Sequence, residues 1–378
     1  MSYNPMDLDS YEPVVRIVVI GVGGAGNNAV NRMIDDGIDN VEFYVLNTDK
    51  QALATSKAPN RIVLGEGVTS GLGAGGNPQV GREAAMQSTE KIREIVKGAN
   101  MVFIAAGMGG GTGTGAAPVV ASLAREEGAL TIAIVTRPFT FEGKTRIANS
   151  VSGLSELKDA VDSIIIVSND KLLMAKGNLP ISQAFSESDT VLSQSVRTVV
   201  ELILLPAVIN LDYADVRATL ESSGIALIGF GEGHGDHKAE EAAENAINSP
   251  LLEASISGAR KAICAVTCGA DVSLYEAEEC VNRIIEQSGS TIDIKFGVSI
   301  NPQLADGIRV SVIASDFNEE FDFTSVPNFQ APLKNGLSGR GPEPMRPHEK
   351  SEDGYGDNEN AAEESIGAQI LPNFLKGI

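Results

Sequence analysis

The sequence is short of positive charge, and this shortage limits the partners that it can bind. Its 378 residues include 29 Lys and Arg against 50 Asp and Glu, which gives a formal net charge of −21. Binding of nucleic acid needs clustered Lys and Arg that neutralise phosphates, and adsorption to anionic lipid needs the same residues. We therefore expect no nucleic-acid partner and no adsorption to a lipid surface.

Long apolar runs and a secretion signal are missing as well. No apolar run reaches the roughly 18 residues that span a bilayer, and residues 1–11 are polar and acidic, unlike a signal peptide. The three cysteines, Cys264, Cys268 and Cys280, form no CxxC pair. They fit buried reduced thiols better than a disulfide framework or a metal site. These absences predict a cytoplasmic protein without direct membrane insertion.

Glycine, in contrast, is abundant, and the first half of the chain alternates strand and helix patterns. There are 40 glycines, about 11% of the chain against an average of about 7%. Nearly continuous apolar strands separated by helices indicate a parallel sheet covered on both faces. We place these strands at 16–22, 41–49, 101–107, 130–138 and 163–170, and later helices near 78–97, 114–127 and 143–160.

The second half has a different organisation. Residues 181–205 predict one long helix, and a smaller α/β domain follows without a glycine-rich loop. Its strands are expected near 225–230, 261–267, 291–296 and 308–314, and its helices near 238–247 and 273–287. Residues 331–365 contain four Pro, five Gly, eight acidic residues and one aromatic residue. Because so little apolar surface cannot offset the entropy of ordering, we expect a disordered linker there.

A glycine-rich loop joins the first strand to the first helix. It reads GVGGAGNN over residues 21–28. Glycine lets the backbone approach a phosphate, and the helix N-terminus offers free N–H groups. Asp49 ends the next strand, near where an acid would bind the ribose of a dinucleotide. Taken alone, this loop fits a dinucleotide site, and a tight turn without a ligand is the simpler alternative.

A second loop of the same kind favours a longer phosphate chain. AAGMGGGTGTGAAP, residues 105–118, also joins a strand to a helix, and Thr112 and Thr114 add hydroxyl groups to its bare backbone. Because a dinucleotide has one pyrophosphate and needs one such loop, two loops indicate a ligand such as a triphosphate. Residues 71–78, GLGAGGNP, are a third candidate, with a surface loop as the alternative.

Two other enzyme classes fit the sequence poorly. A Walker A loop is absent, because Pro138 stands where the glycine five residues before Gly143 would be required. An NAD(P)-dependent oxidoreductase with a Rossmann domain is the remaining alternative. The three histidines all lie in polar loop-like or linker segments, however, and offer no plausible catalytic group for that chemistry.

A pair of carboxylates follows the long helix. Asp212 and Asp215 are three residues apart, so in the first turn of a helix both project to one side. Two carboxylates there can orient a water for attack on a phosphate, or they can simply cap the helix. A helix of about 25 residues spans roughly 37 Å, so we expect these acids to lie far from the loops at its start.

Several segments resemble those of the tubulin/FtsZ GTPase superfamily. GGGTGTG resembles its signature loop, and GVGGAGNNAVNRM resembles the FtsZ branch. NTDKQAL, TRPFTFEG, NLDYADV and SPLLE also agree in order, over residues 14–316. The resemblance implies a GTPase that binds GTP or GDP with Mg²⁺, polymerises head to tail into protofilaments, and forms the ring of bacterial cell division at mid-cell.

The resemblance also predicts how the chain is divided, as an α/β protein with a Rossmann-like parallel-sheet domain first. It predicts a flexible segment at 1–12, a GTP-binding domain at 13–180, a central helix at 181–206, a C-terminal GTPase-activating domain at 207–317, a disordered linker at 318–365 and a partner-docking peptide at 366–378.

The resemblance assigns most of the phosphate contacts to the glycine-rich loops. The α- and β-phosphates would lie against Gly23, Gly24, Ala25, Gly26, Asn27 and Asn28. The β- and γ-phosphates would lie against Gly109, Gly110, Gly111, Thr112 and Gly113, with Ala74, Gly75, Asn47 and Asp49 near the γ-phosphate. No side chain is identified as a metal ligand.

The same resemblance assigns the remaining parts of the nucleotide. Glu142 and Arg146 would contact the ribose and the nucleotide, Phe185 would stack on guanine, and Asn169 and Asp189 would read its edge. A carboxylate suits guanine, because it accepts hydrogen bonds from the N1–H and 2-amino groups that adenine cannot supply. The alternative for Phe185 is an aromatic residue of the core.

The acids after the long helix would complete the active site of the next subunit. By resemblance these are Asp212 and Asp215, with Asn210 beside them. Such a heterologous contact generates open filaments, and hydrolysis would then occur only at subunit interfaces. Tyr213 stands where Phe is commoner in the family, and because the ring is kept we expect little change.

The end of the sequence resembles the docking peptide of the family. Its apolar anchors are Ile370, Leu371, Pro372, Phe374 and Leu375. Apolar anchors behind a disordered tether suit binding in a groove. By resemblance the partners are membrane tethers such as FtsA, ZipA or SepF, together with division regulators.

Overall fold

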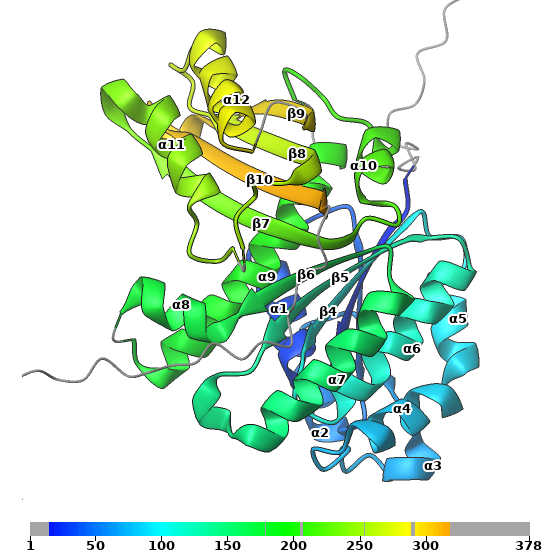
Figure 1. Cartoon of the computed structure of the whole chain (residues 1–378). Helices are drawn as coiled ribbons and strands as arrows, with labels where there is room; N and C mark the ends of the chain where they lie inside the picture. The colour runs from blue at the N-terminus through cyan, green and yellow to red at the C-terminus, as the bar shows by residue number, and fades with distance from the viewer. Residues whose placement is uncertain (1–14, 178, 205–206, 253, 289–291, 318–378) are drawn as a thin grey trace, which may run out of the picture. The chain divides into compact units, whose positions relative to one another are not determined.

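The structure is a computed structural model, and it describes residues 15–177, 179–204, 207–252, 254–288 and 292–317 (Figure 1). The expected segments at 1–12, 318–365 and 366–378, including the docking peptide, therefore lie outside the described residues. Within the described residues the strands are β1 (Ile17–Val22), β2 (Glu42–Asn47), β3 (Asn60–Val63), β4 (Met101–Gly107), β5 (Leu130–Arg137), β6 (Ser163–Ser168), β7 (Gly224–Gly233), β8 (Ala259–Cys268), β9 (Asp293–Ile300) and β10 (Ile308–Phe317).

These strands form a ten-stranded sheet in the order β3-β2-β1-β4-β5-β6-β7-β10-β8-β9. The pairs from β3 to β7 are parallel, β10 runs antiparallel to β7 and β8, and β8 is parallel to β9. The helices are α1 (Gly23–Asp35), α2 (Lys50–Ala54), α3 (Glu66–Thr69), α4 (Pro78–Gln87), α5 (Thr89–Val96), α6 (Thr112–Glu126), α7 (Lys144–Ala160), α8 (Asn169–Lys176), α9 (Ile181–Leu204), α10 (Tyr213–Leu220), α11 (Lys238–Ile247) and α12 (Leu274–Ser288). Short 3₁₀ turns lie at Thr140–Glu142, Gly235–His237 and Pro302–Leu304.

The parallel part of the sheet is buried on both faces, as the apolar strands predicted. Along β1, Ile17 and Val19 join a core with α1 and α9, whereas Val18 and Ile20 join a core with α4 to α7. Figure 1 shows these two groups of helices on opposite sides of the strands. The α/β fold with a Rossmann-like first domain is therefore confirmed.

The structure differs from the sequence prediction in several elements, since β3, α2 and α3 were not predicted and α8 begins inside the strand expected at 163–170. The second unit does not hang on the long helix alone, because β7 continues the sheet and pairs with β6, for example through Ser163 and Gly224. The helix expected at 78–97 is two helices, α4 and α5. They meet at Ser88, a buried residue whose hydroxyl accepts a hydrogen bond from the N–H of Gly65 at 3.0 Å.

The long helix α9 connects the two halves of the sheet. It has 24 residues, and Leu192, Val196 and Val199 are buried against the same core as α1. It begins soon after β6 and α8, at the edge where the parallel strands end. The chain then continues through α10 into β7.

Candidate nucleotide site

An open cavity of about 340 Å³ lies where the parallel strands end. Ligands of open α/β sheets bind in this position, outside the carboxyl ends of the strands. The lining residues come from both glycine-rich loops, from the end of β5 and from the starts of α8 and α9. They are Gly24, Ala25, Asn28, Gly107, Met108, Gly110, Gly111, Thr112, Gly113, Thr136, Pro138, Glu142, Arg146, Asn169, Phe185, Ser188 and Asp189.

The two glycine-rich loops present helix N-termini to this cavity. α1 begins at Gly23 and α6 at Thr112, and neither helix has a side-chain cap at its first turn. The first N–H groups of both helices therefore lack a capping side chain and can bind an anion. Two such N-termini at one cavity suit a chain of several phosphates.

Glycine is required where the two loops approach each other. A Cβ atom at Gly26 would lie 2.2 Å from the carbonyl oxygen of Ala105. Gly23 has a φ of +74°, and a Cβ there would lie 2.8 Å from the backbone nitrogen of Gly113. Gly23 and Gly26 are not among the residues that line the cavity, and their direct contact with a phosphate stays a prediction.

The threonines of the second loop hold its shape. Thr112 Oγ1 lies 2.7 Å from Thr48 Oγ1, and Thr114 Oγ1 accepts a hydrogen bond from the N–H of Gly109 at 2.8 Å. Both hydroxyls thus have a partner within the protein, and Thr112 also lines the cavity. Thr48 was missed by the sequence reasoning, although it lies between two predicted residues, Asn47 and Asp49.

Three predicted polar residues of the first loop and second strand are not among the residues that line the cavity. Asn27 and Asn47 are both buried. With its amide nitrogen directed at the loop, Asn27 donates to the carbonyls of Gly21 and Gly23 at 3.2 and 2.9 Å. Asp49 caps α2, its carboxylate accepting from the N–H of Gln51 at 2.8 Å. Direct phosphate contact by these residues stays a prediction.

The third loop lies beside the second. Ala74 packs on Gly111, because a Cβ placed at Gly111 would be 2.8 Å from the Ala74 side chain. Asn149 of α7 donates to the carbonyls of Gly76 and Gly109 at 3.3 and 3.4 Å, which links the two loops. Ala74, Gly75 and Gly109 lie outside the lining of the cavity. Asn149 carried no motif signal in the sequence.

An aromatic side chain is available at the other end of the cavity. Phe185, at the start of α9, is 41% exposed and lines the cavity, so it is not a core residue. Its ring meets the buried Phe139 edge to face at a centroid distance of 5.1 Å, and Phe139 stacks on Phe141 at 5.0 Å. This support fixes the ring of Phe185 as a flat surface on which a base can stack.

A hydrogen-bond donor and a hydrogen-bond acceptor lie beside Phe185 in the lining of the cavity. Ser188 donates to the side-chain oxygen of Asn169 at 2.8 Å, which leaves the amide NH₂ group of Asn169 as a donor. Burial raises the pKa of Asp189 to about 7, and the positive charge of Arg32 opposes this shift. A carboxylate and an amide NH₂ match the donors and the carbonyl oxygen along the edge of guanine.

Glu142 and Arg146 lie on the cavity wall between the loops and the base end. They form an ion pair one helical turn apart, and Glu142 also accepts from the N–H of Phe139 at 3.0 Å. The guanidinium of Arg146 is exposed, and contact of Glu142 and Arg146 with the ribose and the nucleotide stays a prediction.

The acids after α9 are placed away from the cavity. Asp212 caps α10, accepting from the N–H of Asp215 at 2.8 Å, and Asn210 accepts from the N–H of Ala207 at 2.7 Å. The capping role considered from the sequence is therefore real. None of the three residues lines the cavity, and α9 continues for about 22 Å beyond Asp189 before the chain reaches them.

The cysteines take no part in this site. Cys264, Cys268 and Cys280 are free and buried, as predicted, and burial raises the pKa of Cys280 to about 12. In the described ranges, no cluster of three metal-binding side chains is found. No helix in the same ranges is long and apolar enough to cross a membrane.

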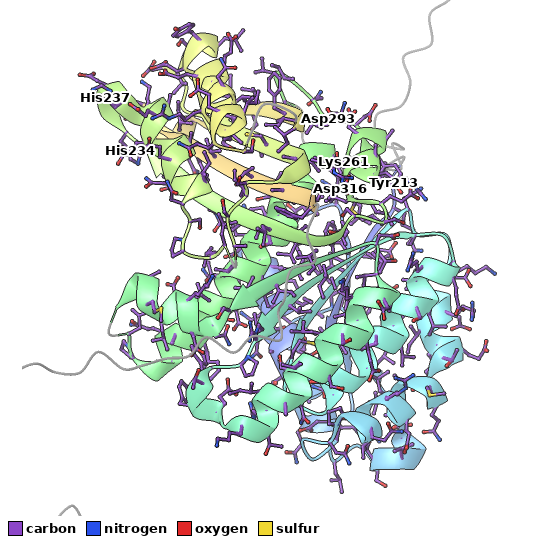
Figure 2. All side chains as sticks on the ribbon, viewed as in Figure 1. Tyr213, His234, His237, Lys261, Asp293 and Asp316 are labelled. Atoms are coloured by element: carbon purple, nitrogen blue, oxygen red, sulfur yellow. The ribbon has the colours of Figure 1, made fainter. Side chains whose placement is uncertain are left out.

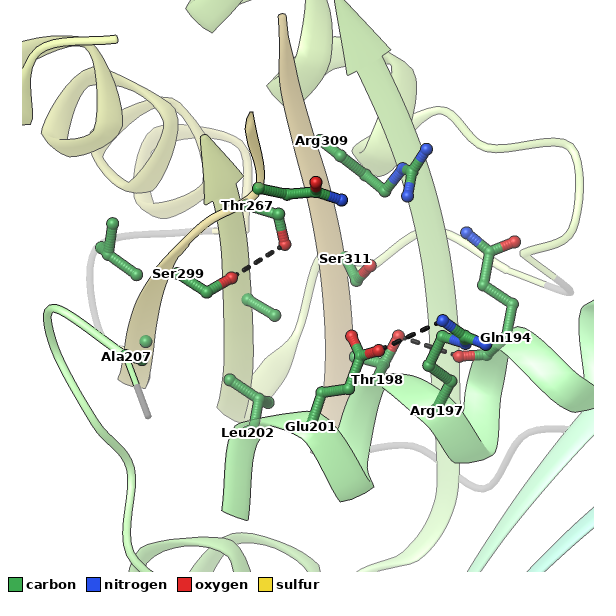
Figure 3. Close-up of a pocket in the computed structure, with 14 residues that line it drawn as sticks. Gln194, Arg197, Thr198, Glu201, Leu202, Ala207, Thr267, Ser299, Arg309 and Ser311 are labelled. Atoms are coloured by element: carbon green, nitrogen blue, oxygen red, sulfur yellow. Dashed lines mark hydrogen bonds and ion pairs between the residues drawn. The ribbon is translucent and has the colours of Figure 1, made fainter. Parts of the chain in front are cut away.

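A second, smaller cavity was not anticipated from the sequence. It measures about 110 Å³ and lies between α9 and the strands β8, β9 and β10 (Figure 3). Its lining mixes apolar and polar side chains: Arg197 pairs with Glu201 at 3.3 Å, and Ser299 donates to Thr267 at 3.1 Å. It lies on the part of α9 that follows the nucleotide cavity.

Family models and known proteins match most of the chain. The model of the tubulin/FtsZ family GTPase domain matches residues 16–176, and that of the FtsZ family C-terminal domain matches residues 224–318. The chain is 50% identical over 307 residues to the cell division protein FtsZ of Aquifex aeolicus, covering 81% of this chain and 84% of that protein.

Solved structures agree with this match. An empty FtsZ dimer from M. jannaschii is similar with a TM-score of 0.76 and 42% identity, over 80% of this chain and 88% of that one. CetZ2 from Haloferax volcanii, a GTPγS-bound protofilament, shares the fold at a TM-score of 0.68 and 21% identity, over 79% and 92%. The chain therefore belongs to the FtsZ family, and its first domain is the GTPase domain of that family.

Proposed function

We propose that this protein polymerises head to tail into protofilaments, hydrolyses GTP at the subunit interfaces and forms the cytokinetic ring of bacterial cell division. The observation that carries the proposal is the separation of two halves of a hydrolytic site. Phe185 and Asp189, at the start of α9, line the nucleotide cavity, whereas Asp212 and Asp215 follow the other end of that helix. Acids that are remote from their own cavity can act in the cavity of the next subunit.

In the proposed site, each residue has a chemical task. The N-termini of α1 and α6 bind the phosphates, Phe185 stacks on guanine, and Asn169 and Asp189 select guanine over adenine. Asp212 and Asp215 of the neighbouring subunit accept hydrogen bonds from the attacking water and so orient it towards the γ-phosphate. Asn210, which holds the turn before α10 through Ala207, supports their placement.

Mg²⁺ is the proposed companion of GTP. The phosphate end of the cavity is lined by glycine backbone and by Thr112, which are neutral groups. Such a lining fits an ion that arrives with the nucleotide, held by phosphate oxygens and water rather than by protein carboxylates. When bound, the ion would neutralise the charge that develops on the phosphates.

The proposed location is the cytoplasm at mid-cell, with attachment to the membrane through a partner. The support is the sequence of the segment at 366–378 and the cell-division role in the name of the Aquifex relative. The proposed partners are FtsA, ZipA or SepF, and division regulators. The proposed domain limits are those given with the resemblance.

One experiment tests the proposal against its rivals. Light scattering and phosphate release are followed after GTP, ATP or NAD is added to the full chain with Mg²⁺. We expect scattering and phosphate release with GTP alone. Assembly without phosphate release would indicate a filament protein that does not hydrolyse GTP. No response to GTP would contradict the proposal and leave the oxidoreductase alternative, which the family matches do not support.

A further inference from the structure

A tyrosine ties the first turn of α10 to the nucleotide-binding half of the sheet. Tyr213 Oη donates a hydrogen bond to the backbone carbonyl of Asn100 at 2.8 Å, and Arg217 Nη1 donates to Tyr213 Oη at 3.2 Å. Tyr213 lies between Asp212 and Asp215, so this contact belongs to the same turn as the two acids. Figure 2 labels Tyr213 at α10, near Lys261.

Asn100 is a firmly held acceptor for this hydrogen bond. Its N–H donates to the carbonyl of Arg16 at 2.9 Å, and its side-chain oxygen accepts from the N–H of Arg16 at 2.8 Å. Its carbonyl also accepts from the N–H of Leu130 at 2.9 Å. Asn100 is thereby joined to the starts of β1, β4 and β5, whose other ends lead into the nucleotide cavity.

The last turn of α10 is fastened to the other half of the sheet. Lys261 of β8 donates to the carbonyl of Ala218 at 2.8 Å, and Ser315 of β10 donates to the carbonyl of Thr219 at 3.0 Å. The two ends of α10 are therefore held by different domains. The Tyr213 hydroxyl links the acid-bearing end of α10 to the domain that binds nucleotide by a directed hydrogen bond, in addition to the packing of Val216 on the core of that domain.

We propose that Tyr213 is a positioning residue for GTP hydrolysis. Its hydroxyl fixes the first turn of α10 against Asn100, so that Asp212 and Asp215 meet the neighbouring subunit's nucleotide in one geometry. This inference rests on the shared site proposed above. A hydrogen bond constrains direction, which packing of the ring alone does not. The hydroxyl that distinguishes Tyr213 from the commoner Phe therefore has a larger role than we expected from the sequence.

The test compares two tyrosine variants of the full chain. Tyr213→Phe removes the hydroxyl, and the variant is expected to fold because the Asn100 carbonyl keeps its bond to Leu130. Tyr44→Phe is the matched control, since it removes a hydroxyl that bonds Glu42 at 3.3 Å on β2. Glu42 keeps its bonds to Arg16 at 2.6 and 2.8 Å, so the support of Asn100 by Arg16 is retained. GTP affinity, critical concentration, KM and turnover per assembled subunit are measured for each variant.

We expect Tyr213→Phe to lower turnover per assembled subunit about tenfold, since a displacement of about 1 Å can cost up to about 10²-fold in rate. Its GTP affinity, KM and critical concentration should stay within about twofold of wild type, because the nucleotide cavity is untouched. Tyr44→Phe should turn over at the wild-type rate. Equal turnover in Tyr213→Phe and Tyr44→Phe overturns the inference, and so does a loss that a raised critical concentration fully explains.

A double variant separates positioning from general stability. If Tyr213 acts by positioning Asp212, Tyr213→Phe lowers turnover in the wild-type background but causes little further loss of turnover in the Asp212→Ala background. Equal reductions in both backgrounds would mean that Tyr213 does not act through Asp212. Full turnover of Asp212→Ala alone would instead contradict the shared site itself, and the role of Tyr213 would be lost with it.

Discussion

Asp189 connects the chemistry of the candidate site to pH. Burial raises the pKa of its carboxyl to about 7, and Arg32 only partly offsets this. The neutral carboxyl cannot accept hydrogen bonds on both oxygens from guanine as the carboxylate can. Binding of guanine should therefore select the ionised form, lower its pKa and release a proton.

We predict that affinity for GTP rises as the pH increases from about 6 to about 7 and levels off above about 8. Calorimetry in two buffers of different ionisation enthalpy measures both the affinity and the proton release. Asp189→Asn, which cannot ionise, should bind more weakly and show a flatter pH profile. Wild-type affinity that does not change between these pH values would contradict this role for Asp189.

Asp212 has two tasks that a pair of variants can separate. Its carboxylate caps α10 through the N–H of Asp215, and we propose that it also orients the attacking water. Asp212→Ala loses both tasks, whereas Asn is a good helix cap without the charge. Both variants should bind GTP, because Asp212 does not line the cavity.

We predict that both Asp212→Ala and Asp212→Asn lower turnover by about 10²–10⁴-fold and leave filaments that persist. Only Asp212→Ala should also lose stability, by about 1 kcal/mol. Phosphate release and thermal unfolding measure the two effects. Wild-type turnover in Asp212→Asn would show that capping is the whole task of Asp212.

At the scale of elements, the sequence predicted the strands and helices well where one local signal decides. The glycine loops could be read from strand and helix patterns on either side, and buried strands such as β1 and β4 are almost wholly apolar. The pairing of β7 with β6 depends on contacts distant in sequence, and so it was missed. Thr48, Asn149 and the hydroxyl of Tyr213 were missed for the same reason, since each acts through a partner far along the chain.

The proposed docking peptide is an element whose task should be separable from hydrolysis. We predict that deletion of residues 370–378 leaves GTP turnover and filament formation nearly intact, because every residue assigned to the nucleotide or to the water lies before position 216. The deletion should abolish binding to a membrane-bound partner, because Leu371, Phe374 and Leu375 supply the apolar area that docking would bury. Turnover and partner pull-down for full-length and truncated protein measure this. Loss of polymerisation with partner binding intact would contradict it.

At the scale of the whole molecule, the sheet and α9 set the direction of the proposed filament. The nucleotide cavity opens where the parallel strands end, whereas Tyr213 meets Asn100 where β4 begins. The phosphate-binding groups therefore lie at the carboxyl ends of the parallel strands, and the acid-bearing turn lies at their amino ends. If the two halves of one site lie at opposite ends of the strands, as we propose, copies of the subunit join head to tail, and such contacts form an open filament unless a rotation closes them into a ring.

The most direct measurement of this arrangement is GTP turnover per molecule as a function of protein concentration. If the site is shared, turnover per molecule should be close to zero in dilute solution and rise steeply above the concentration at which light scattering reports filaments. Asp212→Ala serves as the control, since it should scatter light without releasing phosphate at the wild-type rate. Turnover per molecule that stays constant on dilution to nanomolar protein would contradict the shared site, because a single subunit would then hydrolyse GTP by itself.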